Sequence, residues 1–194
     1  MEQFIEILGT AVGLVYLWLE YKASIYLWIA GIIMPAIYLF IYYNAGLYAD
    51  FGINIYYLVI ALYGFIAWKT GFSFTGKKED MNELRISCMP ANAIIKAAIT
   101  YIIAQCAIAW LLINHTDSTV PLADSFTTAL SIVGMWLLAR KYIEQWWVWC
   151  VVDVASGALY VYKGLYFTAG LYLLYSIIAI FGYFKWKKMM QDGR

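Results

Sequence analysis

One acidic residue stands inside a long apolar and aromatic stretch of this sequence. Asp153 lies in this stretch, and no Lys or Arg occurs between Lys141 and Lys163. If the stretch spans a bilayer, Asp153 lies near the middle of the hydrocarbon, where an ionised side chain costs at least a few kcal/mol. Such a group persists where it faces a bundle interior, water or a cationic ligand. The residue therefore indicates a binding group for a cation, although it could instead be a structural carboxylate bonded to neighbouring hydroxyls.

Four polar and aromatic residues of this stretch share one helical face, because they follow spacings of four, three and four. They are Trp149, Asp153, Ser156 and Tyr160. We expect this face to be the wall of a substrate-binding site, with Trp149 in contact with the substrate. Trp146 is a further candidate, but it lies nearer the end of the stretch, where tryptophan is equally typical of an anchor at the membrane interface.

A second group of candidates lies earlier in the chain. Asp50, Asn54 and Tyr57 share one face of an expected helix. Asp50 could bind substrate or only cap the helix, and Asn54 could bind substrate or tie two helices together. Gln105 is the one strongly polar side chain in an otherwise apolar run, where it could face the substrate path or bond a neighbouring helix in an oligomer.

The sequence lacks the groups that an enzyme of the membrane needs. Membrane hydrolases and transferases use paired carboxylates or clusters of Ser and His, whereas His115 is the only histidine. The three cysteines have no metal-ligand spacing, and no phosphate-binding motif accompanies the charges. We therefore predict no catalytic residues, no metal, no cofactor and no nucleic-acid partner.

The composition is that of an integral membrane protein. The chain is 64% hydrophobic and only 13% charged, against about 25% charged residues in a soluble domain. Pro90-Ala91-Asn92 is expected to start the fourth helix, and Asp124 or Ser125 to cap the fifth. Seven apolar runs predict membrane spans; they cover residues 4–21, 25–43, 52–69, 92–113, 124–141, 146–162 and 165–187.

The basic residues predict how these spans are oriented. With seven spans, Lys163 is the only one of the 13 Lys and Arg residues that falls on the same side as the N-terminus. Because Lys and Arg concentrate in cytoplasmic loops, we predict an external N-terminus and a cytoplasmic C-terminus. Glu2 and Glu6 stand where a signal peptide has basic residues, so no signal peptide is expected.

The chain also repeats itself at an offset of 118 residues. The offset pairs Trp28 with Trp146 and Gly64 with Gly182, among many other identities. We predict a first three-helix repeat over 1–70, a linker with a connecting fourth helix over 71–123, and a second repeat over 124–194. One extra helix between two three-helix units makes the repeats parallel, and repeat transporters bind substrate between their repeats. The expected fold is an all-α bundle of seven helices in a 3+1+3 arrangement.

These motifs resemble the PnuC family of B-vitamin transporters. The resemblance rests on Glu144-Gln145-Trp146-x-x-Trp149-x-x-x-Asp153, together with Gly164-Leu165-Tyr166 and Gly46-Leu47-Tyr48-Ala49-Asp50. It implies a SWEET-like fold, a homotrimer in the bacterial inner membrane, and facilitated diffusion without an ATPase. It also implies a functional link to a cytoplasmic kinase, which traps the vitamin by phosphorylation.

The resemblance leaves the vitamin open. Family members that carry nicotinamide riboside usually have Asn where this chain has Asp153, and often Gln where it has Met135. A carboxylate suits a fixed cation such as thiamine, and nearby indole rings attract cations. Nicotinamide riboside is also a cation, whereas riboflavin is neutral. We therefore expect thiamine first, nicotinamide riboside as the alternative and riboflavin third.

Overall fold

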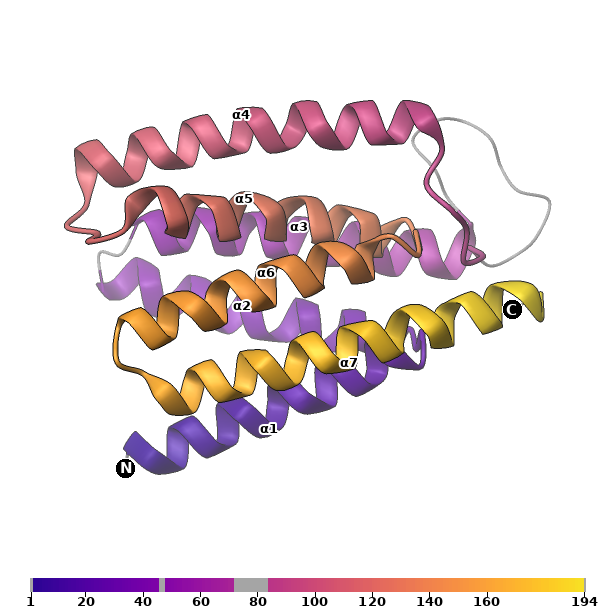
Figure 1. Cartoon of the computed structure of the whole chain (residues 1–194), viewed down its shortest axis with the longest axis horizontal. Helices are drawn as coiled ribbons and strands as arrows, with labels where there is room; N and C mark the ends of the chain where they lie inside the picture. Colours follow the sequence, from indigo (N-terminus) through magenta and orange to yellow (C-terminus); the bar gives the residue numbers. More distant parts are fainter. Residues whose placement is uncertain (1, 46–47, 72–83, 194) are drawn as a thin grey trace. The chain divides into compact units, whose positions relative to one another are not determined.

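The computed structural model describes residues 2–45, 48–71 and 84–193 of the chain, and these regions contain seven α-helices (Figure 1). Each predicted span corresponds to one helix, which confirms the all-α fold. Four of the described helices, α3, α4, α5 and α7, are long and apolar enough to cross a membrane. The linker predicted around Lys77 lies outside the described residues. The helices are α1 (Glu2–Tyr21), α2 (Tyr26–Ala45), α3 (Tyr48–Thr70), α4 (Ala91–His115), α5 (Pro121–Ala139), α6 (Gln145–Tyr162) and α7 (Tyr166–Gln191).

Helix α5 begins earlier than the sequence predicted. Val120 is its N-cap and Pro121 its first residue, so the prediction that Asp124 or Ser125 caps this helix was wrong. Proline suits a first helical position because its missing N–H would have no partner there and its φ is already helical. The prediction for α4 is confirmed, since that helix starts directly after Pro90.

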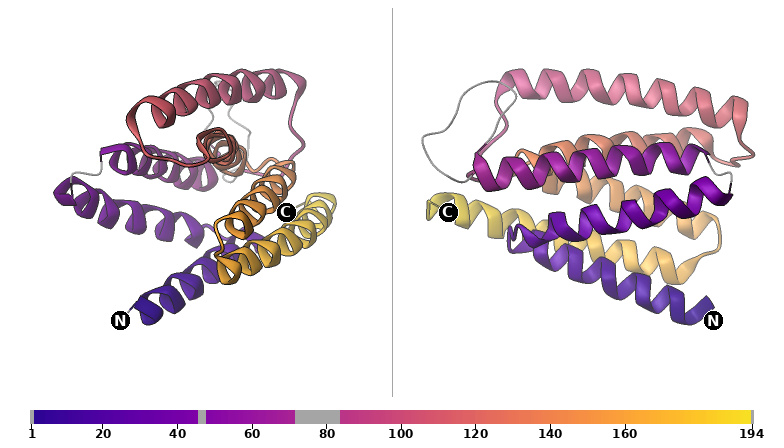
Figure 2. Two further views of the ribbon diagram at one scale, coloured as in Figure 1. Left: turned by 60° about the vertical axis from the view of Figure 1, so that its left-hand side comes forward. Right: turned by 180° about the vertical axis from the view of Figure 1, so that it is seen from behind.

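The chain divides into two compact units. Unit 1 covers residues 1–85 and holds α1, α2 and α3, and unit 2 covers residues 86–194 and holds α4 to α7. In unit 1, α2 contacts both α1 and α3, and in unit 2 each helix packs against the next one along the chain (Figure 2). Helix α4, which the sequence predicted only as a connector, therefore packs with the second repeat.

Unit 1 contains a wedge of tryptophan against glycine. The ring of Trp28 on α2 is fully buried and meets Trp68 on α3 edge to face, with centroids 5.5 Å apart and planes at 86°. A methyl group added to Gly64 on α3 would clash with the Trp28 ring. Only glycine at this position lets the two helices close over the indole.

Unit 2 contains the same wedge, 118 residues later. Trp146 on α6 meets Trp186 on α7 with centroids 5.6 Å apart and planes at 88°. A Cβ added to Gly182 would lie 2.6 Å from the Trp146 ring. Both helix pairs, α2 with α3 and α6 with α7, are therefore joined by one arrangement of side chains, as the sequence repeat predicts.

The turns before α2 and α6 are also alike. Ala23 in unit 1 has a φ of 49° and Lys141 in unit 2 a φ of 52°, a left-handed conformation that is uncommon for residues other than glycine. After Ala23, the amide of Ser24 donates to the carbonyl of Leu19 at 2.9 Å. The equivalent bond in unit 2 runs from the amide of Tyr142 to the carbonyl of Leu137 and measures 3.0 Å. The repeat therefore extends to backbone conformation.

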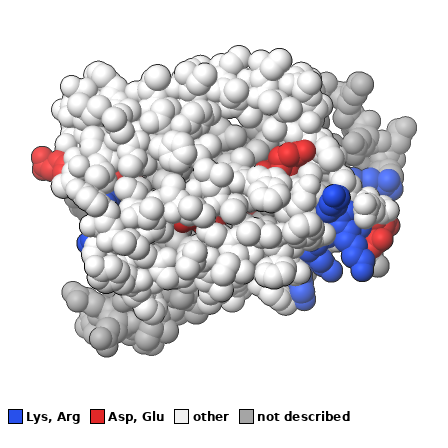
Figure 3. All heavy atoms as spheres, in the orientation of Figure 1, with Lys and Arg blue, Asp and Glu red and all other residues white. Residues whose placement is uncertain are grey.

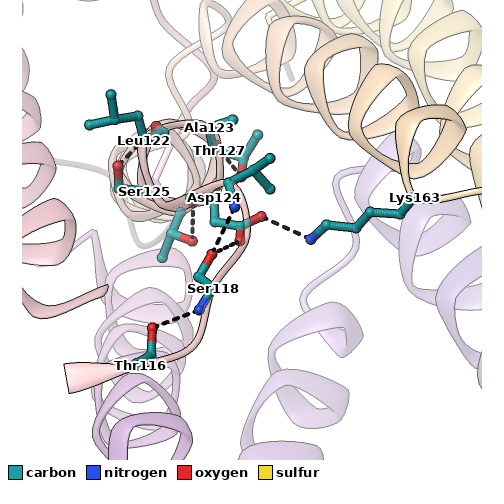
Figure 4. Close-up of polar contacts among 10 residues, drawn as sticks. Thr116, Ser118, Leu122, Ala123, Asp124, Ser125, Thr127 and Lys163 are labelled. Atoms are coloured by element: carbon teal, nitrogen blue, oxygen red, sulfur yellow. Dashed lines mark hydrogen bonds and ion pairs between the residues drawn. The ribbon is translucent and has the colours of Figure 1, made fainter. Parts of the chain in front are cut away.

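Charge is concentrated at the helix ends of unit 2. Figure 3 shows basic side chains gathered where α7 ends, beside a broad face that carries few charged side chains. At the opposite helix ends, Lys163 after α6 forms an ion pair of 3.2 Å with Asp124 in the first turn of α5. Ser118 donates to the other oxygen of Asp124 at 2.8 Å (Figure 4). This pair ties the start of α5 to the α6–α7 turn.

Candidate substrate-binding site

Asp153 is a buried carboxylic acid without a protein cation beside it. It lies in the middle of α6, and only 8% of the residue is exposed. Within the described part of the chain, its side chain forms neither a hydrogen bond nor an ion pair. Tyr172 and Tyr175 on α7 lie close enough to Asp153 to interact with its charge. Among the described residues, the surroundings of Asp153 are therefore aromatic and hydroxylic, and none of their Lys or Arg side chains forms an ion pair with the carboxylate.

The close packing of α6 on α7 brings these tyrosines to Asp153. A Cβ added to Gly157 on α6 would lie 3.6 Å from the carbonyl oxygen of Ala169 and 3.7 Å from Cβ of Tyr172. Such small residues let membrane helices approach closely. One turn further along α6, Tyr160 stacks on Tyr172 with centroids 5.1 Å apart. The α6–α7 pair therefore places an aromatic layer beside the carboxylate.

Trp149 lies one turn before Asp153 and faces α5. A Cβ added to Gly134 on α5 would lie 3.2 Å from the indole of Trp149, so the ring occupies the space that this glycine leaves. The indole Nε1 is buried and has no hydrogen-bond partner among the described residues. A buried donor of this kind calls for an acceptor, which a bound substrate can provide.

In unit 1, the space equivalent to that of the Trp149 ring is filled by a side chain from α1 and not from α2. Gly31 on α2 takes the place of Trp149, and Tyr16 on α1 takes the place of Gly134. A Cβ added to Gly31 would lie 3.8 Å from the Tyr16 ring. The repeats thus keep one aromatic side chain here but take it from different helices, and only unit 2 places it one turn from a carboxylate.

A cavity of about 330 Å³ lies between α6 and α7, and Asp153 is its only charged lining residue. Gly157 and Gly170 contribute to its walls, and Tyr166 lies towards the α6–α7 turn. The volume lies at the lower end of the range found for small-molecule sites, about 300–1,000 Å³. Asp153 therefore borders this cavity, whereas Trp149, Ser156 and Tyr160 do not line it.

Trp146 serves helix packing. It is 1% exposed, and the wedge with Gly182 and Trp186 accounts for its ring. Because Trp28 makes the same wedge in unit 1, where Pro35 takes the place of Asp153, the arrangement does not depend on a binding carboxylate. The Nε1 of Trp146, like that of Trp149, is buried without a hydrogen-bond partner among the described residues, so substrate contact by Trp146 stays a prediction.

The remaining predicted residues lie on other helices. Asn54 and Tyr57 are half-buried on α3 of unit 1, and the side chain of Asp50 lies outside the described part of the chain. Gln105 on α4 donates to the hydroxyl of Ser125 on α5 at 2.9 Å, so it ties two helices together. Within unit 2, the structure brings Trp149, Asp153, Ser156 and Tyr160 onto one face of α6, where Asp153 and Ser156 are buried.

Two residues beside this face were not selected from the sequence. Tyr175 is the repeat partner of Tyr57, and this equivalence was the available signal for its position near Asp153. Gln145 lies four residues before Trp149 and is fully buried. The four-residue helical spacing, extended from Trp149 towards the N-terminus, would have identified Gln145.

The chain matches the family model described as nicotinamide mononucleotide transporter over residues 3–188. It is 24% identical over 180 residues to the nicotinamide riboside transporter PnuC of Neisseria mucosa, covering 88% of this chain and 66% of that protein. It is also 24% identical over 207 residues to the protein of the same name from Escherichia coli, covering 94% of this chain and 84% of that one.

A further relative is the riboflavin/roseoflavin transporter RibM of Streptomyces davaonensis, which is 25% identical over 183 residues, covering 93% of this chain and 83% of RibM. The fold is similar to that of the crystal structure of the vitamin B3 transporter PnuC, with a TM-score of 0.67 and 21% identity over 94% of this chain and 80% of that one. Because the family model spans almost the whole chain, the protein belongs to the PnuC family of nicotinamide mononucleotide transporters and is a multi-pass membrane transporter, not an enzyme.

Proposed function

We propose that this protein carries nicotinamide riboside across the membrane by facilitated diffusion, with Asp153 as the group that binds the positively charged pyridinium ring. Trp149 provides an aromatic face for the same cation, and Ser156, Tyr160 and Tyr172 complete the α6–α7 side of the site. Asn54 and Tyr57 are proposed contributions from the first repeat. Gln105 and Trp146 are left out of the proposed site, because Gln105 bonds Ser125 on α5 and the Trp146 ring packs against Gly182 and Trp186 on α7.

The observation that carries this proposal is the isolation of Asp153. A buried carboxylate is costly unless a charge or several hydrogen bonds compensate it, and among the described residues Asp153 has neither an ion pair nor a hydrogen bond. A cationic substrate provides the missing charge. Contact with an aromatic face adds about 0.5–2 kcal/mol when the cation loses its water. A site of this kind favours a flat organic cation over a neutral molecule.

The choice among cations comes from the relatives. Two of those described above are named for nicotinamide riboside and one for riboflavin, and none for thiamine. They therefore favour nicotinamide riboside over thiamine, which the sequence had placed first. Thiamine is the second candidate, because a carboxylate at position 153 suits its permanent charge. Riboflavin is third, because a neutral ring leaves that carboxylate uncompensated.

The transport cycle proposed here needs no energy source of its own. The gates on the two sides of the membrane open alternately, and a cytoplasmic kinase traps the vitamin by phosphorylating it. We propose a bacterial inner-membrane location with the N-terminus outside and the C-terminus in the cytoplasm, which the basic end of α7 supports. We also propose a homotrimer, which cross-linking of the membrane-embedded protein would test.

The proposal is tested by titrating the purified protein with nicotinamide riboside, thiamine and riboflavin and following tryptophan fluorescence, together with uptake of each compound into proteoliposomes. The expected order of affinity is nicotinamide riboside, then thiamine, then riboflavin. Thiamine binding tenfold tighter than nicotinamide riboside, about 1.4 kcal/mol, would reverse the assignment. Binding of none of the three, by protein that reconstitutes normally, would refute it.

A further inference from the structure

Gln145, the first residue of α6, carries a fully buried side-chain amide that lacks a hydrogen-bond partner in the described part of the chain. Its exposed fraction is 0%, and neither Oε1 nor Nε2 has a hydrogen-bond partner among the described residues. Its backbone N–H is satisfied by the carbonyl of Tyr142 at 3.2 Å, so only the side chain is left over. Leaving a buried polar atom unpaired costs roughly 1–3 kcal/mol, which makes an amide here expensive unless something binds it.

The amide lies on the same helical face as the candidate site. Gln145, Trp149 and Asp153 follow one another at intervals of four residues along α6, and residues at this interval share a face. The rise from Gln145 to Asp153 is about 12 Å, comparable to the length of one nucleoside-sized molecule. The indole of Trp149, whose Nε1 is also unpartnered, lies between the two polar groups.

The first repeat shows what packing alone requires at this place. Leu27 is the residue 118 positions before Gln145, and it too has an exposed fraction of 0%. Each of the two residues is followed by a tryptophan that makes the same wedge, Trp28 and Trp146. A leucine of similar size therefore satisfies the fold in unit 1. The amide in unit 2 adds no packing that leucine lacks, so its role is chemical.

We propose that Gln145 is a specificity-determining residue, whose side-chain amide binds a substrate group that presents a hydrogen-bond donor next to an acceptor, while Asp153 binds the positive charge of the same molecule. A primary carboxamide has such an edge, and so does an aminopyrimidine. A glutamine amide pairs with either through two hydrogen bonds. This inference rests on the proposed function and adds the feature by which the site distinguishes an organic cation that has such an edge from one that lacks it.

The experiment compares two probes that differ only in the amide: nicotinamide riboside, and pyridinium riboside, which keeps the positive ring but lacks the carboxamide. The variant is Gln145→Met, and its matched control is Leu27→Met at the equivalent buried position, since swaps among large aliphatic side chains are well tolerated. Ligand affinity and melting temperature are measured for both variants. Gln145→Leu is a second variant in case methionine disturbs folding.

We expect Gln145→Met to bind nicotinamide riboside about tenfold more weakly than the unaltered protein, and pyridinium riboside as well as the unaltered protein does. Its melting temperature should be unchanged or higher, because an unpaired amide has been removed. Leu27→Met should bind both probes normally. Asp153→Asn should weaken both probes together, because both carry the ring charge.

Equal weakening of both probes by Gln145→Met, or a lower melting temperature with normal affinity for both, would show a structural amide and overturn the inference. Unchanged affinity for both probes with unchanged stability would overturn it as well. In these cases the proposed function stands, provided that the unaltered protein binds nicotinamide riboside. If the unaltered protein binds neither probe, the proposed function fails and the inference with it.

Discussion

At the scale of single residues, the difference between the two repeats is more informative than either repeat alone. Position 149 holds Trp in the second repeat and its equivalent holds Gly31 in the first, while Asp153 is matched by Pro35. Residues that agree between the repeats, such as the tryptophan wedges, serve packing. Gln145, Trp149 and Asp153 on α6 differ from their equivalents Leu27, Gly31 and Pro35, and they belong to the candidate site.

Trp149→Ala should weaken binding of nicotinamide riboside. Loss of one aromatic face beside a desolvated cation costs roughly 0.5–2 kcal/mol, a change of about two- to thirtyfold in affinity. The measurement is the shift of the melting temperature by the ligand, because the substitution also removes a fluorophore.

The matched control is Trp147→Ala. Trp147 is exposed and packs against Tyr183 with centroids 5.0 Å apart, and it lies on a different face of α6. It should lose no ligand-induced shift. An equal loss in the two variants would mean that Trp149 acts through the folding of α6 and not through contact with substrate.

The sequence could predict the α6 face but not all of its members. Spacing alone placed Trp149, Asp153 and Ser156 together, because a helix fixes which residues share a face. Trp146 lies three positions before Trp149, so spacing alone does not separate their roles. Trp146 packs against Gly182, and only the folded α6–α7 pair shows this contact. Burial also distinguishes Gln145 from other amides, and burial is a property of the packed helices.

At the scale of helices, the tryptophan wedge is what holds α6 against α7. We predict that Gly182→Ala destabilises the protein by roughly 1–3 kcal/mol, the usual cost of overpacking a filled core. The added methyl group would lie 2.6 Å from the Trp146 ring. Because this ring is buried and wedged against Trp186, it has little room to move. Thermal unfolding in detergent, followed by tryptophan fluorescence, measures the effect.

Gly170→Ala on the same helix is the matched control, since nothing lies within 4 Å of its added Cβ. The repeat provides the same experiment a second time, with Gly64→Ala as the test and Gly52→Ala, which also meets nothing within 4 Å, as the control. Two glycine substitutions that are no more harmful than their controls would disprove the wedge.

The seven helices could be predicted from the apolar runs and from the residues that begin and end them. Apolar runs of membrane length gave the seven spans, and Pro90 marked the start of α4 correctly. The start of α5 was misjudged, because Asp124 is a good capping residue by type but Pro121 fixes the helical φ three residues earlier. The residue types therefore predicted that α5 exists, whereas the backbone conformation of Pro121 determines where it begins.

At the scale of the whole molecule, the distribution of charge carries the proposed orientation. With α5 and α6 joined by a short turn, Arg140 and Lys141 share one side of the membrane with the basic end of α7. Lys163 lies on the other side, where Asp124 pairs with it. Within unit 2, the described basic residues therefore keep the charge bias that the sequence showed.

We predict that a membrane-impermeant maleimide added to intact spheroplasts labels a cysteine at position 163 but does not label Cys88. Cys88 is exposed just before α4, on the proposed cytoplasmic side, and should be labelled only after the membrane is opened. Lys163→Cys is made in a variant that lacks Cys106 and Cys150. Labelling of Cys88 in intact spheroplasts, with Lys163→Cys protected, would invert the proposed orientation.

The identity of the vitamin could not be deduced from the sequence, because the same carboxylate attracts any flat cation. Asp153 determines charge preference, whereas the fit of ring and sugar depends on the shape of the site. The relatives moved the assignment from thiamine to nicotinamide riboside, which sequence reasoning had kept as its alternative. Charge recognition is common to both assignments and is the central claim of the account.

That claim is tested most directly with Asp153→Asn and two forms of one ligand. Nicotinamide riboside carries a positive ring, and its reduced dihydro form has nearly the same shape without the charge. The unaltered protein should bind the charged form at least tenfold more tightly, about 1.4 kcal/mol, and Asp153→Asn should abolish this preference. Equal binding of the two forms by the unaltered protein, or a preference that survives in Asp153→Asn, would contradict the account.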